Sequence, residues 1–171
     1  MTDIFENVNS NCGDREGIKI LKYSRWMNSI LRRSEEIGKV ELPICSIILD
    51  ERGRCIGRGV NRRNINKDPL GHAEIMALRQ ASLIKNDWRF NECIIITNLE
   101  PCTRCASALI QARMGKVVFG AYDKKRGGLG GSIDLSKHKS SHHKMEIVGG
   151  ILEDECSKNL QLWFKKLRTQ K

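Results

Sequence analysis

Two short motifs constrain the fold of this chain more than any other feature. The first is His-Ala-Glu at 72–74, and the second is Pro-Cys-Thr-Arg-Cys at 101–105. His72 and Cys102 are 30 residues apart, which is enough chain for one helix, one loop and one strand. If each motif begins a helix, both helix N-termini meet at one end of a sheet.

The residue types in these motifs are those that bind zinc. A catalytic zinc takes three nitrogen or sulfur ligands from the protein and keeps its fourth position for water. His72, Cys102 and Cys105 supply one nitrogen and two sulfurs. The two cysteines are three residues apart at the start of a predicted helix, where both sulfurs can face the same way and thiolate is favoured over thiol. We therefore expect one Zn²⁺ per chain at these residues.

Glu74, two residues after His72, is the candidate catalytic residue. Zinc lowers the pKa of a bound water to about 7, so a nearby carboxylate can remove its proton at neutral pH. Glu74 would take that proton, pass it to a ring nitrogen and then help an amine to leave. The combined pattern H-x-E…P-C-x-x-C is the known signature of zinc-dependent nucleobase deaminases.

Simpler explanations of these residues stay open at this point. A lone Cys-x-x-C in a reducing compartment is also typical of a thioredoxin-like redox pair, although such a pair needs no H-x-E upstream. A structural zinc usually has a fourth ligand. The candidates for it are Cys93, His138, His142 and His143. Glu74 is also compatible with an ordinary position on a helix surface.

The composition favours one folded domain in a reducing compartment. A chain of 171 residues has the length of one compact domain. Its seven cysteines are an odd number with no secretory segment before them, which argues against a disulfide framework. No apolar run is long enough to span a bilayer. We expect a cytoplasmic protein with no membrane association, a flexible segment at 1–16 and a single zinc-dependent deaminase domain at 17–171.

Hydrophobic periodicity and turn signals predict alternating helices and strands. The expected helices span 17–37, 72–83, 102–113 and 153–171. The expected strands span 44–49, 55–60, 93–97, 117–119 and 145–148. A glycine-rich stretch at 127–131 predicts a flexible loop. The alternation favours an α/β protein, a three-layer α/β/α sandwich around one sheet.

Positive charge is concentrated toward the C-terminus. The formal net charge is +10; residues 111–171 carry 13 basic and 6 acidic side chains, against 17 and 14 in residues 1–110. Such an excess is compatible with a solubilising surface and also with an electrostatic footprint for nucleic acid. Charge alone does not separate the two explanations.

Four stretches of the sequence resemble the bacterial tRNA-specific adenosine deaminases, within the cytidine/deoxycytidylate deaminase-like superfamily. Two carry the deaminase site, D-P-L-G-H-A-E-I-M-A-L-R-Q-A at 68–81 and L-E-P-C-T-R-C-A-S-A-L-I-Q-A-R at 99–113. Two are more particular to the tRNA enzymes, V-V-F-G-A-Y-D-K-K-R-G at 117–127 and G-G-I-L-E-D-E-C at 149–156. The resemblance runs from about 43 to 168. It implies the cytidine deaminase-like fold, with a central mixed sheet of about five strands.

The resemblance also implies an activity and partners. The activity is hydrolytic conversion of the wobble adenosine of a tRNA anticodon to inosine, with water attacking carbon six of adenine and ammonia released. The partners are the tRNA anticodon stem-loop and a second copy of the chain, in a homodimer in which each tRNA touches both subunits.

Substrate-binding residues follow from the same resemblance. Asn61 matches a family asparagine that contacts the purine, and an amide can donate and accept at adjacent atoms; a role only in shaping the turn is the alternative. The backbone N–H of Ala73 matches a contact to the base or to the attacking oxygen. His143, Lys165 and Lys166 fall in regions that lie near the RNA in this family, and ordinary exposed side chains are the alternative there.

Several positions depart from the family pattern. Cys45-Ser46 stand in place of Gly-Ala, Leu70-Gly71 in place of Thr-Ala, Asn98 in place of threonine, and Thr103-Arg104 in place of an apolar pair. None of these departures removes a metal ligand. They therefore bear on the shape of the pocket and not on the chemistry.

Two rival functions remain on sequence alone. One is a deaminase of free bases or nucleosides, such as guanine or cytidine, which would not need the basic C-terminal third. The other is a non-catalytic RNA-binding or partner subunit on the same fold, in which the proton-shuttling glutamate is typically lost. Glu74 is present in this chain.

Overall fold

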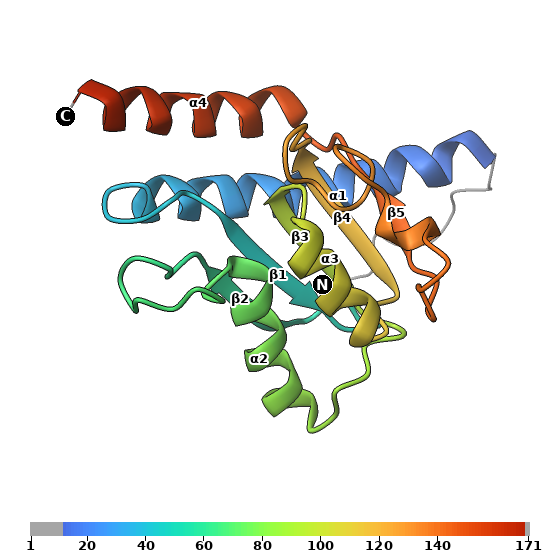
Figure 1. Cartoon of the computed structure of the whole chain (residues 1–171). Helices are drawn as coiled ribbons and strands as arrows, with labels where there is room; N and C mark the ends of the chain where they lie inside the picture. The colour runs from blue at the N-terminus through green and yellow to red at the C-terminus, as the bar shows by residue number, and fades with distance from the viewer. Residues whose placement is uncertain (1–11, 170–171) are drawn as a thin grey trace, which may run out of the picture.

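The computed structural model describes residues 12–169 and contains one five-stranded mixed sheet (Figure 1). The strands are β1 (Cys45–Leu49), β2 (Cys55–Val60), β3 (Ile94–Leu99), β4 (Lys116–Ala121) and β5 (Glu146–Val148). Their order across the sheet is β2-β1-β3-β4-β5. β1 is antiparallel to both of its neighbours, whereas β3, β4 and β5 run parallel to one another.

Helices cover both faces of the sheet. They are α1 (Cys12–Ile37), α2 (Ala73–Lys85), α3 (Thr103–Gln111) and α4 (Glu153–Thr169), with a short 3₁₀ turn, η1, at Leu135–Lys137. α2 and α3 pack on one face, and α1 with the start of α4 packs on the other. Ile95 and Ile96 are adjacent in β3 and belong to the two opposite cores, as the alternation of side chains along a strand requires. The predicted three-layer α/β/α fold is confirmed.

The first helix begins earlier than the sequence pattern predicts. α1 starts at Cys12, so residues 12–16 of the predicted flexible segment are helical. No proline interrupts the chain before residue 17, so the helix can extend in that direction. Residues 1–11 of that segment lie outside the described residues. The other predicted helix and strand ends lie within two residues of the observed ones, except that the predicted end of the last helix, at 170–171, lies outside the described residues.

Close packing of α2 on β2 places the start of α2. Gly57 and Gly59 face the helix, and a Cβ atom at either position would collide with the backbone of Ala77 or Ala73. The absence of side chains on this face of β2 therefore lets the helix backbone approach the strand. The first turn of α2, which follows His72, is positioned by this contact.

Only the first half of α4 is packed against the sheet. Cys156 and Leu160 are buried, whereas Phe164 and Leu167 are both 42% exposed because the helix extends beyond the strands (Figure 1). Trp163 ties this outer half to the end of α1, since its Nε1 donates to the Gly38 carbonyl at 2.9 Å. Among residues 12–169, no helix has the combination of length and apolarity needed to cross a membrane.

Candidate active site

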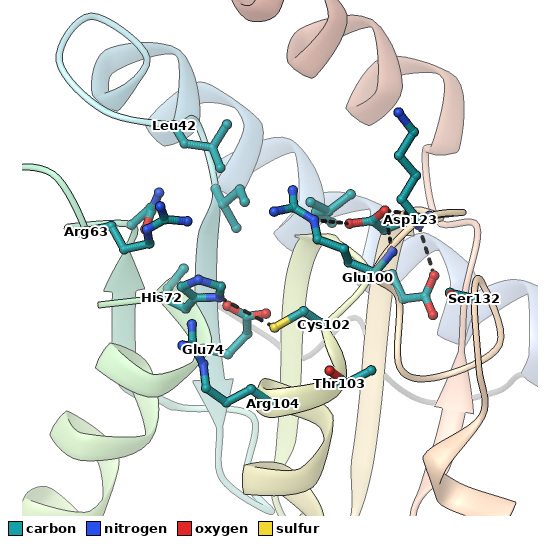
Figure 2. Close-up of a pocket in the computed structure, with 16 residues that line it drawn as sticks. Leu42, Arg63, His72, Glu74, Glu100, Cys102, Thr103, Arg104, Asp123 and Ser132 are labelled. Carbon is teal, nitrogen blue, oxygen red and sulfur yellow. Dashed lines mark hydrogen bonds and ion pairs between the residues drawn. The ribbon is translucent and has the colours of Figure 1, made fainter. Parts of the chain in front are cut away.

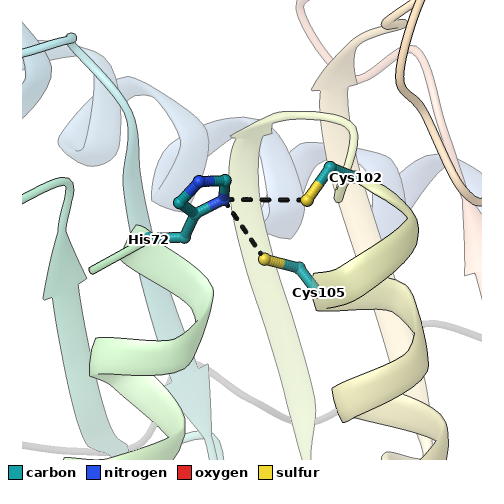
Figure 3. A group of neighbouring side chains, drawn as sticks. All are labelled: His72, Cys102 and Cys105. Atoms are coloured by element: carbon teal, nitrogen blue, oxygen red, sulfur yellow. Dashed lines mark hydrogen bonds between the residues drawn. The ribbon is translucent and has the colours of Figure 1, made fainter. Parts of the chain in front are cut away.

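Figure 3 shows His72, Cys102 and Cys105 together at the N-terminal ends of α2 and α3. His72 Nδ1 lies 3.7 Å from Cys102 Sγ and 3.4 Å from Cys105 Sγ. In a tetrahedral site with Zn–N of about 2.0–2.1 Å and Zn–S of about 2.3 Å, nitrogen and sulfur are roughly 3.6 Å apart. The observed distances lie on either side of that value. The geometry and the donor types therefore fit a single zinc ion.

The local backbone explains how these side chains converge. His72 and Cys102 each occupy the position immediately before a helix, in extended conformation, with φ/ψ of −81°/149° and −64°/167°. Cys105 lies in the first turn of α3 and is buried. Two helix N-termini consequently face the same point, and their free N–H groups favour negative charge there.

The two thiols interact strongly with each other. A hydrogen bond with Cys105, assisted by one with His72, lowers the pKa of Cys102 to about 3 despite partial burial. The same contact with Cys102, together with burial, raises the pKa of Cys105. The two sulfurs therefore differ in their affinity for a proton. A metal binds both as thiolates, so metal binding at this group is favoured as pH rises.

A four-ligand structural site is not formed among residues 20–169, whose side chains the structure describes. The group of metal-ligating side chains there consists of His72, Cys102 and Cys105. Cys93 precedes β3, at the end of that strand away from Cys102. His143 uses its Nε2 in a 2.8 Å hydrogen bond with the Met114 carbonyl. Three protein ligands are the pattern of a catalytic zinc rather than a structural one.

Glu74 lies in the first turn of α2, beside this group. Its side chain is only 4% exposed, and Figure 2 shows its carboxyl group next to the His72 ring and Cys102. Burial raises the pKa of the Glu74 carboxyl, although a backbone hydrogen bond and the neighbouring His72 ring oppose the shift. A carboxylate whose affinity for protons is increased in this way suits a group that must accept and return them.

A cavity of about 380 Å³ opens beside Glu74 and the ligand group (Figure 2). Its volume falls within the range of roughly 300–1,000 Å³ found for small-molecule sites. Leu42, Ile44, Leu99 and the first residue of α2, Ala73, line it. The mixture of aliphatic walls and a few polar groups is suited to a flat heterocycle.

Asn61 provides the cavity with a buried oxygen atom that has no hydrogen-bond partner among the described residues. Asn61 lines the cavity and is 3% exposed. Its Nδ2 lies 3.4 Å from Glu41 Oε1, whereas its Oδ1 is buried without a hydrogen-bond partner among the described residues. Buried polar atoms of this kind are uncommon and often mark a ligand contact.

Comparison with known proteins agrees with this chemistry. The family model for the cytidine and deoxycytidylate deaminase zinc-binding region matches residues 21–121, more than half of the chain. A tRNA-specific adenosine deaminase of Haemophilus influenzae is 33% identical over 150 residues, which cover 88% of this chain and 86% of the relative. One of Bacillus subtilis is 35% identical over 140 residues, covering 82% and 85%. The chain belongs to the tRNA-specific adenosine deaminase family.

Solved structures support the same assignment. A structure from work on A-to-I editing by tRNA:A34 deaminases at the wobble position of transfer RNA superposes with a TM-score of 0.76 at 30% identity, covering 80% of this chain and 99% of that one. A guanine deaminase from Nitrosomonas europaea superposes with a TM-score of 0.67 at 17% identity, covering 95% and 98%. At that lower identity the likeness extends to the fold alone.

Basic side chains surround the mouth of the deaminase cavity. Arg63, Arg104, Lys125 and Arg126 line it, from three different segments of the chain. Within the described part of the chain, only Arg126 among these four has an acidic partner, Asp123 at 3.7 Å. The remaining charges are available to an anionic ligand.

The residues expected on the RNA surface are not all near the cavity. His143 contacts Met114, which follows α3 at its C-terminal end, whereas the cavity lies at its N-terminal end. Lys165 and Lys166 are exposed on the outer half of α4. Lys166 lines a groove with Pro43, next to the segment that provides Leu42 to the cavity.

The departures from the family pattern divide into two groups. Asn98 is buried and joins the segment before β1 to β3, since its Oδ1 accepts from the Cys45 N–H at 2.9 Å and its Nδ2 donates to the Pro43 carbonyl at 2.8 Å. Ser46 is also buried and pairs with Thr97, hydroxyl to hydroxyl, at 3.0 Å. These residues lie outside the cavity wall. Thr103 and Arg104, in contrast, line it.

Glu100 lines the cavity and has an anchoring role that the sequence pattern did not indicate. It follows β3, is 2% exposed, and accepts backbone N–H groups from Asp123 at 2.9 Å, Leu129 at 2.9 Å and Gly131 at 2.8 Å. The predicted flexible loop at 127–131 is therefore anchored, and the prediction was wrong in this respect. A lone acidic residue directly after a buried strand was the signal available in the sequence.

The anchored loop also supports the metal group, by which we mean the candidate ligands His72, Cys102 and Cys105. Gly127 forms a β-bridge with Cys102, and the Thr103 N–H donates to the Arg126 carbonyl at 3.2 Å. A Cβ at Gly127 or Gly131 would collide with the Glu100 carboxylate. Glycine is needed here because backbone and carboxylate approach closely.

Replacement of Glu100 by glutamine tests this anchoring. The amide nitrogen would face either the N–H groups of Leu129 and Gly131 or that of Asp123, so at least one buried hydrogen bond to a charged acceptor is removed, at about 1–3 kcal/mol each in the free energy of unfolding. Urea unfolding and amide hydrogen exchange measure the effect, with faster exchange expected at Leu129 and Gly131 or at Asp123. Glu92→Gln, at an exposed acid, is the control; equal stability of the two variants would contradict the role of Glu100.

Proposed function

We propose that this enzyme converts the wobble adenosine of a tRNA anticodon to inosine by hydrolysis, with release of ammonia. The observation that carries the proposal is the convergence of a His-Cys-Cys group, a buried glutamate and an unpaired amide oxygen on one cavity. Membership in the tRNA-specific adenosine deaminase family supports the choice of substrate.

The reaction replaces the amino group on carbon six of adenine by oxygen from water. In this proposal His72, Cys102 and Cys105 hold one zinc ion, which would supply the Lewis acidity that makes a water a nucleophile at neutral pH. Glu74 takes one proton from the water and gives it to the adjacent ring nitrogen; it then takes the second proton, from the new hydroxyl on carbon six, and gives it to the amine, which leaves as ammonia. The raised pKa of its carboxyl suits these transfers.

The remaining residues orient the base. Asn61 would use its unpaired Oδ1, and the Ala73 N–H lies where a helix N-terminus can donate to an oxygen or ring nitrogen. A target base must leave its stack to enter such a cavity, which is least costly in a single-stranded loop. Both features are consistent with an anticodon loop as substrate.

The basic rim and the outer half of α4 would bind the phosphates of the stem-loop. We propose Arg63, Arg104 and Lys125 near the target nucleotide, and Lys165 with Lys166 further out. Neutralisation of phosphates by such groups releases counterions and strengthens binding at low salt. The location of His143 favours a structural role, in its bond with Met114.

We also propose that the enzyme is a cytoplasmic homodimer with one zinc ion per subunit. Apolar side chains at the end of α2 and in the following loop would be available to a second copy, since Leu83, Ile84 and Trp88 are 82%, 61% and 51% exposed. Exposed apolar groups that cluster in this way are common at protein interfaces.

The catalytic assignment is tested with an anticodon stem-loop that carries adenosine at the wobble position. Glu74→Gln should keep zinc and RNA binding. Its kcat should fall by about 10²–10⁴-fold, because general acid–base catalysis is removed. Inosine is measured by nucleoside chromatography. Near-normal turnover by this variant would exclude Glu74 from the mechanism.

The same assay separates the rival substrates. Guanine, cytidine and free adenosine are offered to the wild-type enzyme beside the stem-loop. Turnover of a free base or nucleoside with equal kcat/KM would contradict the assignment to tRNA.

Metal content tests the ligand assignment. Wild-type protein is expected to contain about one zinc per chain, and Cys102→Ala should lose most of it and unfold more easily, because metal binding is linked to folding. Cys55→Ala, in β2, is the matched control and should retain zinc. Elemental analysis of the purified proteins decides the question, and full occupancy in Cys102→Ala would remove Cys102 from the ligand set.

Charge reversal at Lys165 and Lys166 together tests the RNA surface. KM for the stem-loop should rise while kcat is retained, and the slope of log affinity against log salt should become shallower by about 0.7 for each phosphate that the variant no longer neutralises. The equal charge change at Lys22 and Arg25, on α1, is the control. Unchanged affinity at low salt in the α4 variant would exclude this helix from the RNA surface.

A further inference from the structure

A second buried carboxylate, that of Glu41, lies behind Asn61. Glu41 is 2% exposed and stands between α1 and β1. Its Oε2 accepts the N–H groups of Asn64 at 2.8 Å and Ile65 at 3.2 Å. Its Oε1 accepts from Asn64 Nδ2 at 2.9 Å, the Leu42 N–H at 3.1 Å and Asn61 Nδ2 at 3.4 Å. Every one of these partners is a donor.

These contacts determine the orientation of the Asn61 amide. An ionised carboxylate can only accept hydrogen bonds, so the Asn61 side chain must present its nitrogen to Glu41. The reversed amide would place Oδ1 against a carboxylate oxygen inside a buried site, where two facing acceptors are strongly unfavourable. With the nitrogen held, Oδ1 is left without a partner among the described residues.

The same carboxylate joins two walls of the cavity. Leu42, whose N–H it accepts, lines the cavity from the segment before β1, and Asn61 lines it from the segment after β2. Glu41 is itself supported by α1, since its N–H donates to the Ile37 carbonyl at 2.9 Å. A change at Glu41 can therefore reach the cavity through both Leu42 and Asn61, and of these two Asn61 provides the polar side chain.

We propose that Glu41 is a positioning residue that fixes the Asn61 amide with its oxygen available to the cavity. The site then selects a nucleoside that offers a hydrogen-bond donor at this point. The amino group of the base and a ribose hydroxyl share that chemistry. The inference rests on the proposed function, because it assigns a specificity determinant to the same cavity.

Glu41→Gln tests the proposal with little change in shape. The glutamine oxygen can still accept the N–H groups of Asn64 and Ile65, but its Nε2 faces Asn61 and favours the flipped amide, whose oxygen is withdrawn from the cavity. The same Nε2 also faces the Leu42 N–H and Asn64 Nδ2, so Tm should fall, as in Glu100→Gln. At a temperature where the variant is folded, we expect kcat/KM for the stem-loop to fall by about tenfold or more, the effect of removing one hydrogen bond, with zinc content close to wild type.

Two further variants distinguish positioning from general support. Asn64→Ala removes a different partner of Glu41 and leaves the contact with Asn61 intact, so its kcat/KM should stay within about threefold of wild type. Glu41→Gln combined with Asn61→Asp restores an acceptor in the cavity, since one aspartate oxygen takes the glutamine N–H and the other remains available. The double variant should recover at least part of the activity that Glu41→Gln lacks.

A modified substrate identifies which group of the nucleoside donates the hydrogen bond to Asn61 Oδ1. A stem-loop with 2′-deoxyadenosine at the wobble position lacks one ribose hydroxyl. If that hydroxyl is the donor, wild type and Glu41→Gln should act on it equally; if the amino group is the donor, the difference between them should persist. Either outcome supports the role of Glu41, provided that wild type has a higher kcat/KM than Glu41→Gln on the stem-loop with adenosine at the wobble position.

A measurement without turnover completes the test. The side-chain amide signals of Asn61 in ¹H–¹⁵N spectra, assigned by their absence in Asn61→Ala, should shift in Glu41→Gln. Failure of wild-type protein to deaminate the stem-loop would overturn the proposed function, and these signals would still decide the orientation. Unchanged Asn61 signals, or kcat/KM within about threefold of wild type in Glu41→Gln, would overturn the role of Glu41.

Discussion

The approach of two helix N-termini to one point is the constraint on which the rest of this structure depends. His72 precedes α2, and Cys102 with Cys105 begins α3, so their donor atoms lie within 4.8 Å of one another only if both helices start at the same end of the sheet. β3 leads directly into α3, and close contact with the glycines of β2 holds α2. The metal group is therefore a consequence of how two helices pack on three neighbouring strands.

Three buried carboxylates around the cavity, those of Glu41, Glu74 and Glu100, have different environments. Glu41 and Glu100 are surrounded by N–H donors, which compensate for the burial of charge and hold the segments at 61–65 and 123–131. Glu74 has fewer such donors, and burial raises its pKa. The same residue type thus serves as a structural anchor where backbone donors converge on it and, in the function we propose, as a proton carrier where they do not.

The departures from the family pattern follow the same division. Asn98 and Ser46 form buried hydrogen bonds between β1, or the segment before it, and β3, away from the cavity wall. Arg104 instead adds a positive charge to the cavity mouth, beside Arg63 and Lys125. Arg104 therefore lies on the surface that we propose meets the phosphates, and none of these departures replaces His72, Cys102 or Cys105.

The sequence by itself determined the ligand group and the alternation of helices and strands, because spacing and periodicity are local properties that one sequence displays. It also indicated Asn61, through resemblance, but not why its amide has one orientation. The roles of Glu41 and Glu100 could not be predicted, since apart from the Leu42 N–H their partners lie 20–31 residues further along the chain and come into reach only after folding. Phe164 and Leu167 repeat the helical spacing of Cys156 and Leu160, yet they remain exposed, because the sheet ends before the helix does. Tertiary structure alone decided these outcomes: burial and hydrogen bonding of a side chain depend on which distant segments reach it.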